Sequence, residues 1–317
     1  MSRRLPITVV GSINRDIVVH YDTLPRIGET VFGEHLSFGH GGKGANQAFA
    51  ASRLGGDVAM VGRVGQDEYG ALACRVLATE GCAVAGVRTL GDLSGQALVL
   101  VGRDAGNRIL VIKGANGQFT ARELERDAAL LARGGLVLLQ LEIPLETVVL
   151  AAEKARAGSA RVLLDPAPAI ALPLELLQVT DILTPNQTEL AALTGRAPAS
   201  HAEVIEAAQQ LRAQGPGAVI VKMGAEGCLL LDAHGPRRFA APAVEAIDTT
   251  GAGDCFNAAL AVSLAEDASL ADACRFAVVA ASLSVTRQGA QASAPQRVEV
   301  EELLARVTTG SVQIRRR

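Results

Sequence analysis

The sequence predicts an α/β fold with three layers, in which a mostly parallel β-sheet carries helices on both faces and a small second sheet lies beside it. Short runs rich in Val, Ile and Leu alternate with helical patterns along most of the 317 residues, and this alternation is typical of parallel sheets covered by helices. Apolar residues make up 49% of the chain, which is enough for a substantial buried core. Two strand pairs that interrupt the alternation predict the small sheet.

The first third of the chain contains the start of the main sheet and the whole of the small one. Residues 7–11 form a short β-branched run that ends in glycine, as expected for a buried first strand. The strand pairs lie at 17–21 with 30–38 and at 95–101 with 108–113, the second around turn residues 104–107. Further helices are expected at 48–54 and 68–79, and further strands at 58–61 and 84–90. We expect one domain over residues 1–317, with a β-sheet lid formed by about 15–38 and 95–113.

From residue 120 onward, strands and helices alternate regularly. Thr120 with Glu123, and Ser200 with Glu203, have the spacing of capping boxes at the starts of two helices. Expected strands lie at 136–141, 162–164, 181–183, 219–222, 228–231 and 237–239. Expected helices lie at 120–132, 145–157, 186–193, 200–213, 252–265, 270–287 and 301–307.

Composition narrows the functional classes. The formal net charge of −3 gives no general attraction to nucleic acid or anionic membranes, so neither is expected as a partner. The five cysteines show no CxxC pair and no metal-ligand spacing, and they indicate buried thiols in a reducing compartment. The apolar strand near the N-terminus is too short for a signal-peptide core, and no apolar run approaches a membrane span. We therefore expect a cytoplasmic location.

Residues 248–254, Asp-Thr-Thr-Gly-Ala-Gly-Asp, are the most informative stretch. An apolar pattern with helical spacing follows them, so small residues lead directly into a helix whose first turn contains Asp254. Free backbone N–H groups and the positive end of the helix dipole make such a start a favourable anion site. A carboxylate beside that site can accept a proton, and the combination indicates phosphoryl transfer. The ordinary alternative is an Asp that merely stabilises the start of a helix.

Two common nucleotide-binding motifs are absent from the sequence. No GxxxxGK[ST] motif is present, because Lys43 is followed by Gly44 and residue 37 is not glycine. The first strand leads into residues 11–13, Gly-Ser-Ile, rather than GxGxxG, which argues against a Rossmann dinucleotide site. If the chain transfers a phosphoryl group, its phosphates are expected on the 248–254 turn.

Two glycine-rich motifs, residues 41–48 (Gly-Gly-Lys-Gly-Ala-Asn-Gln-Ala) and 248–254, resemble the two signatures of the ribokinase-like (phosphofructokinase B) sugar kinase family. The supporting segments are 11–16, 140–142, 184–189 and 285–291. Together they span positions 11 to 293 in one order, which makes the resemblance highly specific although each segment alone is weak. The resemblance implies the ribokinase-like fold, ATP as phosphate donor, Mg²⁺ and K⁺ as cofactors, and a homodimer paired through the lid strands.

The resemblance also implies a set of sugar-binding residues. These are Asn14, Asp16, Gly41, Gly42, Lys43, Asn46, Glu142 and Asp254. Amide groups both donate and accept hydrogen bonds, and carboxylates accept them strongly, which suits sugar hydroxyls. The side chain of Arg15, between two of these positions, is expected on the opposite face of an extended segment. Without the family, Asn14 and Asp16 are equally typical of a turn after a strand.

Nucleotide-binding residues follow from the same resemblance. They are Asn186, Lys222, Gly224, Glu226, Gly227 and Gly253, with Glu189 acting near Mg²⁺ through water. Asn186 and Glu189 are also what an ordinary helix N-cap looks like. The long helix near the end of the chain has Val278 and Val279 where the resemblance leads us to expect a polar or ring side chain in contact with adenine. How adenine stacks is therefore left open.

A monovalent-cation site is the third implied feature. The resemblance assigns it to Asp248, Thr250, Ser284, Arg287, Gly289 and Ser293. A carboxylate with carbonyl and hydroxyl oxygens suits K⁺, because hard cations prefer oxygen ligands. Such an ion would order the 248–254 turn without touching the sugar.

The implied reaction is ATP-dependent phosphorylation of D-ribose at its 5-hydroxyl. Asp254 would accept the hydroxyl proton, while backbone N–H groups of Gly251, Ala252 and Gly253 would stabilise the growing charge. The helix dipole is expected to favour the ionised form of Asp254 and so make it a weak base. Other kinases of the same fold, for 2-keto-3-deoxygluconate, fructose or adenosine, remain alternatives, as does a catalytically silent sugar-binding regulator.

Overall fold

The main sheet has a parallel centre and an antiparallel edge. The computed structural model describes residues 4–102 and 107–308, and within them this sheet has nine strands in the order β13-β12-β11-β10-β9-β8-β1-β4-β5. Neighbouring strands from β11 to β5 pair in parallel, whereas β12 and β13 pair antiparallel. The strands are β1 (Ile7–Val10), β4 (Val58–Val64), β5 (Ala83–Thr89), β8 (Leu136–Leu139), β9 (Arg161–Leu164), β10 (Ile182–Leu183), β11 (Ala218–Lys222), β12 (Cys228–Asp232) and β13 (Gly235–Phe239).

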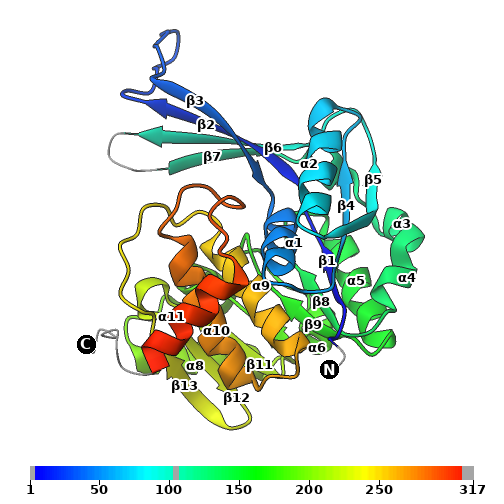
Figure 1. Ribbon diagram of the computed structural model, residues 1–317, viewed down its shortest axis with the longest axis vertical. Coiled ribbons are helices and arrows are strands. Elements are labelled where there is room, and N and C mark those ends of the chain that lie inside the picture. The colour runs from blue at the N-terminus through cyan, green and yellow to red at the C-terminus, as the bar shows by residue number, and fades with distance from the viewer. Residues whose placement is uncertain (1–3, 103–106, 309–317) are drawn as a thin grey trace.

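Helices cover both faces of this sheet, as the sequence predicted (Figure 1). Successive strand residues point to opposite faces, so Val9 belongs to one apolar core and its neighbour Val10 to the other. The core containing Val9 includes α1 (Lys43–Arg53), α2 (Glu68–Thr79), α9 (Ala252–Ala265), α10 (Leu270–Ser284) and α11 (Arg297–Thr308). The core containing Val10 includes α3 (Ala121–Leu124), α4 (Ala128–Leu131), α5 (Leu145–Ala157), α6 (Leu174–Val179), α7 (Gln187–Thr194) and α8 (His201–Arg212).

A separate four-stranded sheet projects beyond one edge of the main body (Figure 1). It consists of β2 (Asn14–Tyr21), β3 (His35–Gly41), β6 (Gly95–Gly102) and β7 (Asn107–Ile112), in the order β3-β2-β6-β7. The two predicted strand pairs are confirmed as antiparallel hairpins, and β2 and β6 join them in parallel. The predicted strand at 30–38 is wrong at both ends, because β3 starts five residues later and continues until Gly41 pairs with Asn14. Turn residues 104–106 lie outside the described ranges.

The junction between the two sheets is tightly packed. Strand β1 ends at Val10 and β2 starts at Asn14, while β3 ends at Gly41 just before α1. Gly42 has φ of 86°, and a Cβ there would lie 2.7 Å from the backbone N of Asn14. A Cβ on Gly44 would lie 2.7 Å from the backbone of Gly11. The glycines of the 41–48 motif therefore allow the start of α1 to pack directly on the segment after β1, and α1 starts five residues earlier than predicted.

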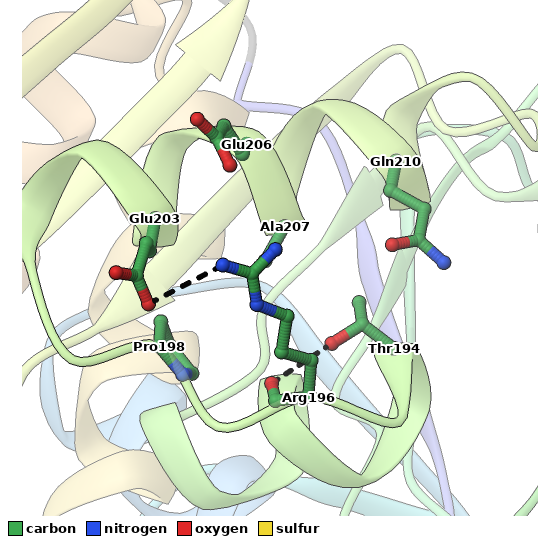
Figure 2. A pocket seen from close by; sticks show the side chains of 7 residues that line it. All are labelled: Thr194, Arg196, Pro198, Glu203, Glu206, Ala207 and Gln210. Atoms are coloured by element: carbon green, nitrogen blue, oxygen red, sulfur yellow. Dashed lines mark hydrogen bonds and ion pairs between the residues drawn. The ribbon is translucent and has the colours of Figure 1, made fainter.

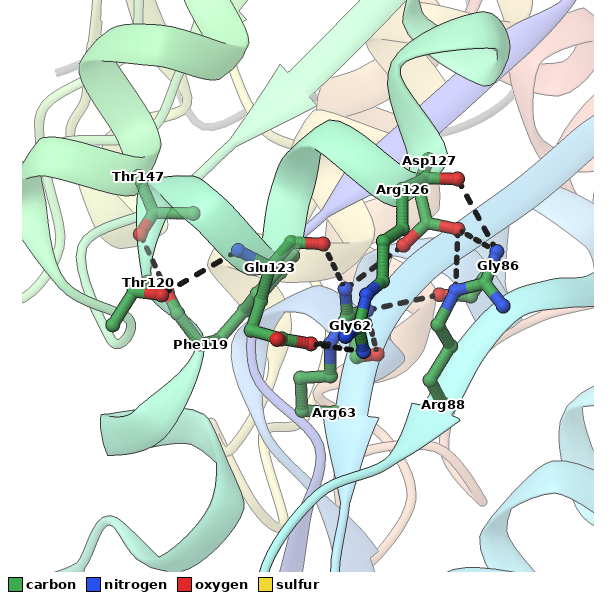
Figure 3. A network of polar contacts seen from close by, with 10 residues as sticks. All are labelled: Gly62, Arg63, Gly86, Arg88, Phe119, Thr120, Glu123, Arg126, Asp127 and Thr147. Carbon is green, nitrogen blue, oxygen red and sulfur yellow. Dashed lines mark hydrogen bonds and ion pairs between the residues drawn. The ribbon is translucent and has the colours of Figure 1, made fainter.

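The helix predicted at 120–132 is broken, which corrects the sequence analysis. It consists of α3, a 3₁₀ turn η2 (Glu125–Asp127) and α4, with Asp127 at φ −116° and ψ 8° at the break. The carboxylate of Asp127 turns inward there and pairs with Arg63 at 2.9 Å and with Arg88 at 2.7 Å (Figure 3). The Thr120 hydroxyl accepts a hydrogen bond from the N–H of Glu123, as expected, but the Glu123 carboxylate faces Arg63 and Arg126 and does not complete the capping box.

None of the five cysteines forms a disulfide bond. All five are free thiols, four of them buried and Cys74 half-buried. Burial raises the pKa of Cys255 to about 12, which agrees with its predicted role in packing rather than as a nucleophile. In the described part of the chain, no helix combines the length and the apolar character that spanning a bilayer requires.

Candidate active site

A cavity of about 500 Å³ opens where α9 meets the carboxyl ends of the central strands. Open α/β sheets bind ligands at this edge. It is lined by many of the predicted site residues, namely Lys43, Asn186, Glu189, Lys222, Gly224, Gly227, Gly251, Ala252, Gly253 and Asp254. The loop before α9 and the α10 residues Val278, Ala281 and Ser282 complete its wall. The cavity thus joins the start of α1 to the start of α9.

A second cavity, of about 140 Å³, lies between the end of α7 and the exposed side of α8. Figure 2 shows Arg196 reaching towards Glu203, with a separation of 3.8 Å between charged atoms. Both side chains are solvated, and such exposed pairs contribute little to binding or stability. The larger cavity, with its buried carboxylates, is therefore the candidate active site.

Asp254 is the buried centre of this site. It is 5% exposed in the first turn of α9, and each carboxylate oxygen accepts one side-chain hydrogen bond. Asn46 Nδ2 donates to Oδ2 at 2.9 Å, and Gln47 Nε2 donates to Oδ1 at 3.1 Å. Burial raises the pKa of Asp254, although nearby Lys43 and the two amide donors oppose the rise. The expectation of a weakened base is therefore wrong in direction, because desolvation outweighs the favourable charges.

The predicted anion site is partly available. Gly251 is the N-cap of α9 with φ of 75°, a conformation that favours glycine. The N–H groups of Gly251 and Gly253 have no hydrogen-bond partner among the residues that the structure describes. The N–H of Ala252 instead donates to the carbonyl of Thr249 at 3.2 Å, so this member of the predicted trio is engaged in a turn. Two amides, and the positive end of the helix, remain for an anion.

Asp16 of β2 and Gly41 of β3, both sugar-binding candidates, lie next to each other. A Cβ on Gly41 would lie only 2.2 Å from a carboxylate oxygen of Asp16, so the absence of a side chain at Gly41 makes room for this carboxylate. Burial, followed by the charges of Glu142 and Asp254, raises the pKa of Asp16 from 3.8 to about 7. Arg15 points to the other face, as predicted, and its guanidinium lies 4.2 Å from the ring centre of Phe38.

Glu142 and Lys43 belong to the same part of the site, because the charge of Glu142 acts on both Asp16 and Lys43. The Glu142 Oε2 atom accepts hydrogen bonds from Ser12 Oγ at 2.5 Å and from the backbone N–H of Lys43 at 3.0 Å. Burial lowers the pKa of the Lys43 ammonium, but the carboxylates around it outweigh burial and raise its pKa. These carboxylates are Asp254, Asp165, Glu142 and Glu189. Lys43 therefore stays charged between the sugar-binding candidates and the anion site.

On the nucleotide side, Asn186 and Glu189 form a complete capping box at the start of α7. The Lys222 Nζ donates to Asp165 Oδ1 at 2.7 Å and lies 3.4 Å from the position of a Cβ on Gly253. This places a cation beside the anion site.

Two of the nucleotide candidates have other contacts. A Cβ on Gly227, whose φ is 91°, would lie 1.9 Å from the carbonyl oxygen of Phe239, so packing of β12 on β13 already requires a glycine there. Glu226 is not brought into the cavity: its carboxylate contacts His201 at 2.8 Å and Arg238 at 3.2 Å.

The predicted cation-site residues form a loop-to-loop contact next to the anion site. Asp248 accepts hydrogen bonds from the N–H of Thr250 at 2.9 Å and of Gly289 at 2.8 Å. Although its burial acts in the opposite direction, these bonds lower the pKa of Asp248. The side chain of Arg287 points elsewhere and pairs with Glu299, so only its backbone could contribute a ligand.

A buried polar layer that was not predicted from the sequence lies behind these residues. Its members are Ser12, Gln47, Asn116, Gln140, Asp165 and Gln291. Asp165 follows strand β9 as Glu142 follows β8, so the same strand-end signal could have identified it. Gln47 and Gln140 lay inside the motifs that carried the family resemblance, but no local pattern indicated their contacts.

Asn116 is the member that reaches the sugar-binding candidates. Its Nδ2 donates to Asn14 Oδ1 at 2.8 Å and to the carbonyl of Ile13 at 3.1 Å, while its Oδ1 accepts from the N–H of Ile13 at 3.0 Å. A Cβ on Gly95 would lie 2.2 Å from Asn14 Oδ1, so glycine makes room for this contact. The amide oxygen of Asn14 is thereby occupied, and its NH₂ group is left as a donor.

Taken together, these groups place a buried carboxylate between hydroxyl-binding side chains and an anion site with two cations, an arrangement suited to phosphoryl transfer. Comparisons with known proteins agree. A model of the pfkB family carbohydrate kinases matches residues 5–297. Ribokinase of Haemophilus influenzae is 38% identical over 302 residues, which cover 95% of this chain and 99% of the relative. Deoxyribokinase of Salmonella typhimurium is 35% identical over 303 residues, with 95% and 99% covered.

A solved structure gives the same answer at the level of the fold. The structure of Arabidopsis thaliana ribokinase complexed with ribose and ATP has a TM-score of 0.90 to this chain and is 36% identical, covering 95% of this chain and 99% of that one. The ribokinase-like fold and the predicted family are confirmed. The chain belongs to the pfkB family of carbohydrate kinases.

Proposed function

We propose that this protein transfers the γ-phosphoryl group of ATP to the 5-hydroxyl of D-ribose. The observation that carries the proposal is the position of Asp254, which lies beside the two free amides of the anion site and accepts a hydrogen bond from Asn46 of the 41–48 motif. Ribokinases that are 36–38% identical to this chain support ribose as acceptor, and the ribose and ATP complex of one of them supports both substrates.

In this proposal, different residues bind the sugar, accept its proton and stabilise the transferred phosphoryl group. Asn14, Asp16 and Glu142 hold sugar hydroxyls, and Asp254 accepts the proton of the 5-hydroxyl as its oxygen attacks the γ-phosphorus. The bond from that phosphorus to the β,γ-bridging oxygen breaks, and ADP leaves. The N–H groups of Gly251 and Gly253 stabilise the charge on the transferred group. Lys43 and Lys222, which both line the cavity, supply positive charge near the transferred phosphoryl group.

Mg²⁺ fits the nucleotide side as an ion carried by ATP. In the described residues no cluster of three or more His, Cys, Asp or Glu could hold a metal by itself, which agrees with an ion held mainly by phosphates. Glu189, 8% exposed in the cavity wall, would contact such an ion through water, because both of its oxygens already accept bonds from Asn186. The bound ion would neutralise phosphate charge.

K⁺ fits the loop around Asp248. The donor set consists of a carboxylate held by Thr250 and Gly289, with the hydroxyl groups of Ser284 and Ser293 bonded to nearby carbonyls through their hydrogens. Lone pairs of these oxygens and backbone carbonyls, including that of Arg287, suit a monovalent cation. Its charge would stabilise the turn that carries Gly251.

The small sheet supports the proposal of a lid and of a homodimer. Several of its large apolar side chains are exposed, namely Leu36, Phe38, Ile109, Leu110, Val111 and Ile112. Exposed apolar side chains gathered on one small sheet are a feature of interaction sites. We propose that one face closes over the sugar to exclude water and that the other pairs with a second copy, in a single 317-residue domain working in the cytoplasm.

2-Deoxy-D-ribose is the rival acceptor, because the Salmonella deoxyribokinase is almost as similar to this chain as the ribokinases are. Release of ADP should be measured with ribose, 2-deoxyribose, fructose, 2-keto-3-deoxygluconate and adenosine, each with and without K⁺. We expect the highest kcat/KM with ribose and a further increase with K⁺. A higher kcat/KM with any other acceptor would contradict ribose as the substrate, and binding of ribose without ADP release would indicate a silent regulator.

A further inference from the structure

Two buried glutamines stand behind the proposed base, and the sequence motifs gave neither of them a role. We propose that Gln47 and Gln140 are positioning residues that hold Asp254 in its proton-accepting state, Gln47 by direct contact and Gln140 by fixing the orientation of the Gln47 amide. The inference rests on the proposed function, because it concerns how the base of that reaction is prepared.

The geometry forms a short chain of hydrogen bonds. Gln140 Nε2 donates to Gln47 Oε1 at 2.6 Å. Gln47 Nε2 then donates to Asp254 Oδ1 and to Asp165 Oδ2, each at 3.1 Å. Both glutamines are 0% exposed, so bulk water does not compete for these bonds.

The orientation of the Gln47 amide decides the electrostatics. With its NH₂ group towards the two carboxylates, each hydrogen is used by one of them. The opposite orientation would place Oε1 against two negative charges and leave both hydrogens directed at the Gln140 NH₂ group. Because Gln140 offers a donor at this point, it selects the first orientation.

Gln140 gives up a hydrogen bond of its own in this arrangement. Its Oε1 is buried with no partner among the described residues, and it is packed 2.0 Å from the position of a Cβ on Gly11. An unsatisfied buried amide oxygen is unusual in a native core and calls for an explanation. Orienting Gln47 supplies one, since turning Gln140 over would satisfy neither side chain.

The charged groups around Asp254 show why a neutral donor matters. Lys43 faces it as a cation, and Asp165, paired to Lys222, faces it as a carboxylate, while the pKa of nearby Asp16 is raised to about 7 by burial and by the charges of Glu142 and Asp254. Gln47 separates the two closest carboxylates, Asp254 and Asp165, and donates to both. Hydrogen bonds to the charged form of a carboxylate favour that form, so loss of Gln47 should make Asp254 hold a proton at higher pH.

The test is a cycle of two substitutions, Gln47→Leu and Gln140→Leu, with kcat measured against pH. Gln47→Leu should move the acidic fall of kcat to higher pH by about one unit, while the dissociation constant of ribose changes less than about threefold. Gln140→Leu should move the acidic fall of kcat in the same direction, but by a smaller amount. In the double variant, Gln140→Leu should add no further shift, because Gln140 acts only through Gln47. Gln209→Leu, which removes an exposed glutamine from α8, is the control.

Three results would overturn the inference. These are an unchanged acidic limb in Gln47→Leu, additive shifts in the double variant, or an equal loss of kcat at every pH in both single variants. Thermal unfolding of each variant separates these results from misfolding. Gln47→Glu supplies a second variant, in which the acidic fall of kcat should also move to higher pH because the substitution adds a carboxyl group beside Asp254.

A readout independent of turnover keeps this inference distinct from the proposed function. The carboxyl carbon of Asp254 can be titrated by ¹³C NMR and assigned by its loss in Asp254→Asn. If no acceptor is phosphorylated, the proposed function fails, whereas a pKa of Asp254 that rises in Gln47→Leu still supports the inference and one that stays unchanged overturns it.

Discussion

Asn46 Nδ2 donates a hydrogen bond to Asp254 Oδ2 at 2.9 Å, and so joins the two glycine-rich motifs across 208 positions of sequence. The contact ties the first turn of α1 to the first turn of α9. Gln291 Nε2 extends it by donating to Asn46 Oδ1 at 3.3 Å from the loop that also holds Gly289. The proposed base is thus bonded to the 41–48 motif and, through Asn46 and Gln291, to the loop that contains the cation-site candidate Gly289.

Ribose affinity should depend on pH through Asp16. Its pKa is raised from 3.8 to about 7 by burial and by the charges of Glu142 and Asp254. The folded protein therefore keeps a proton that the unfolded chain loses, and this contribution to stability is complete below pH 3.8 and lost as pH rises through 7. Sugar hydroxyls donate best to the ionised form, so we expect ribose to bind about tenfold more weakly at pH 6 than at pH 8. Calorimetric titration at both pH values measures this difference.

Asp16→Asn is the control for that titration. This variant should bind ribose more weakly than the wild type, but with a dissociation constant that is equal at the two pH values. A wild-type affinity that does not change between pH 6 and pH 8 would show that Asp16 does not hold the sugar as an ionised acceptor.

Replacing Asn116 should weaken ribose binding without touching the reacting atoms. Asn116→Ala leaves Asn14 free to turn its amide and leaves backbone groups of Ile13 unpaired, at a cost of about 1–3 kcal/mol. We expect the KM for ribose to rise about tenfold and kcat to change less than about threefold. The matched substitution Gln118→Ala, in the same 3₁₀ segment η1 (Gly114–Gln118) but exposed, should leave both constants near wild type. An unchanged KM in Asn116→Ala would contradict the orienting role.

The buried charge of Arg63 should matter for stability. Arg63 is 0% exposed, pairs with Asp127 at 2.9 Å, and has its guanidinium 4.1 Å from the ring centre of Phe119 (Figure 3). Arg63→Met leaves Asp127 buried with Arg88 as its remaining partner, and breaking such a pair typically costs about 3–5 kcal/mol. Urea unfolding of Arg63→Met should show a decrease in the free energy of unfolding that approaches this size.

Arg126→Met provides the comparison for this unfolding experiment. Arg126 pairs with Glu123 in the same network, but its side chain is 63% exposed, and exposed pairs contribute about 0–1 kcal/mol. Equal losses in the two variants would show that burial does not set the importance of Arg63.

The order of elements could be predicted from the sequence because the relevant signals are local. Val9 and Val10 face different cores, and a strand buried on both faces is apolar throughout. Glycine at positions 42 and 251 marks positive φ before a helix, which is also a local requirement. Helix α6, only six residues long, was missed because it is too short to show a helical period.

The polar layer behind the site could not be predicted in the same way. Gln47 meets Asp165 across 118 positions and Gln140 across 93, and no pattern within a window of sequence reports such contacts. Asp127 breaks the predicted 120–132 helix because it binds Arg63, 64 positions away. The sign of the pKa shift of Asp254 was missed for the same reason, since its burial depends on the packing of α1 against α9.

The role of Asp254 as the base is tested most directly by the turnover of Asp254→Asn with ribose and ATP, compared with the ribose affinity of this variant. Asparagine keeps the shape of the side chain but cannot accept the hydroxyl proton. We expect kcat to fall by about 10²–10⁴-fold, while the dissociation constant of ribose changes only a few-fold. A variant with nearly normal kcat would contradict the role of Asp254 as the base.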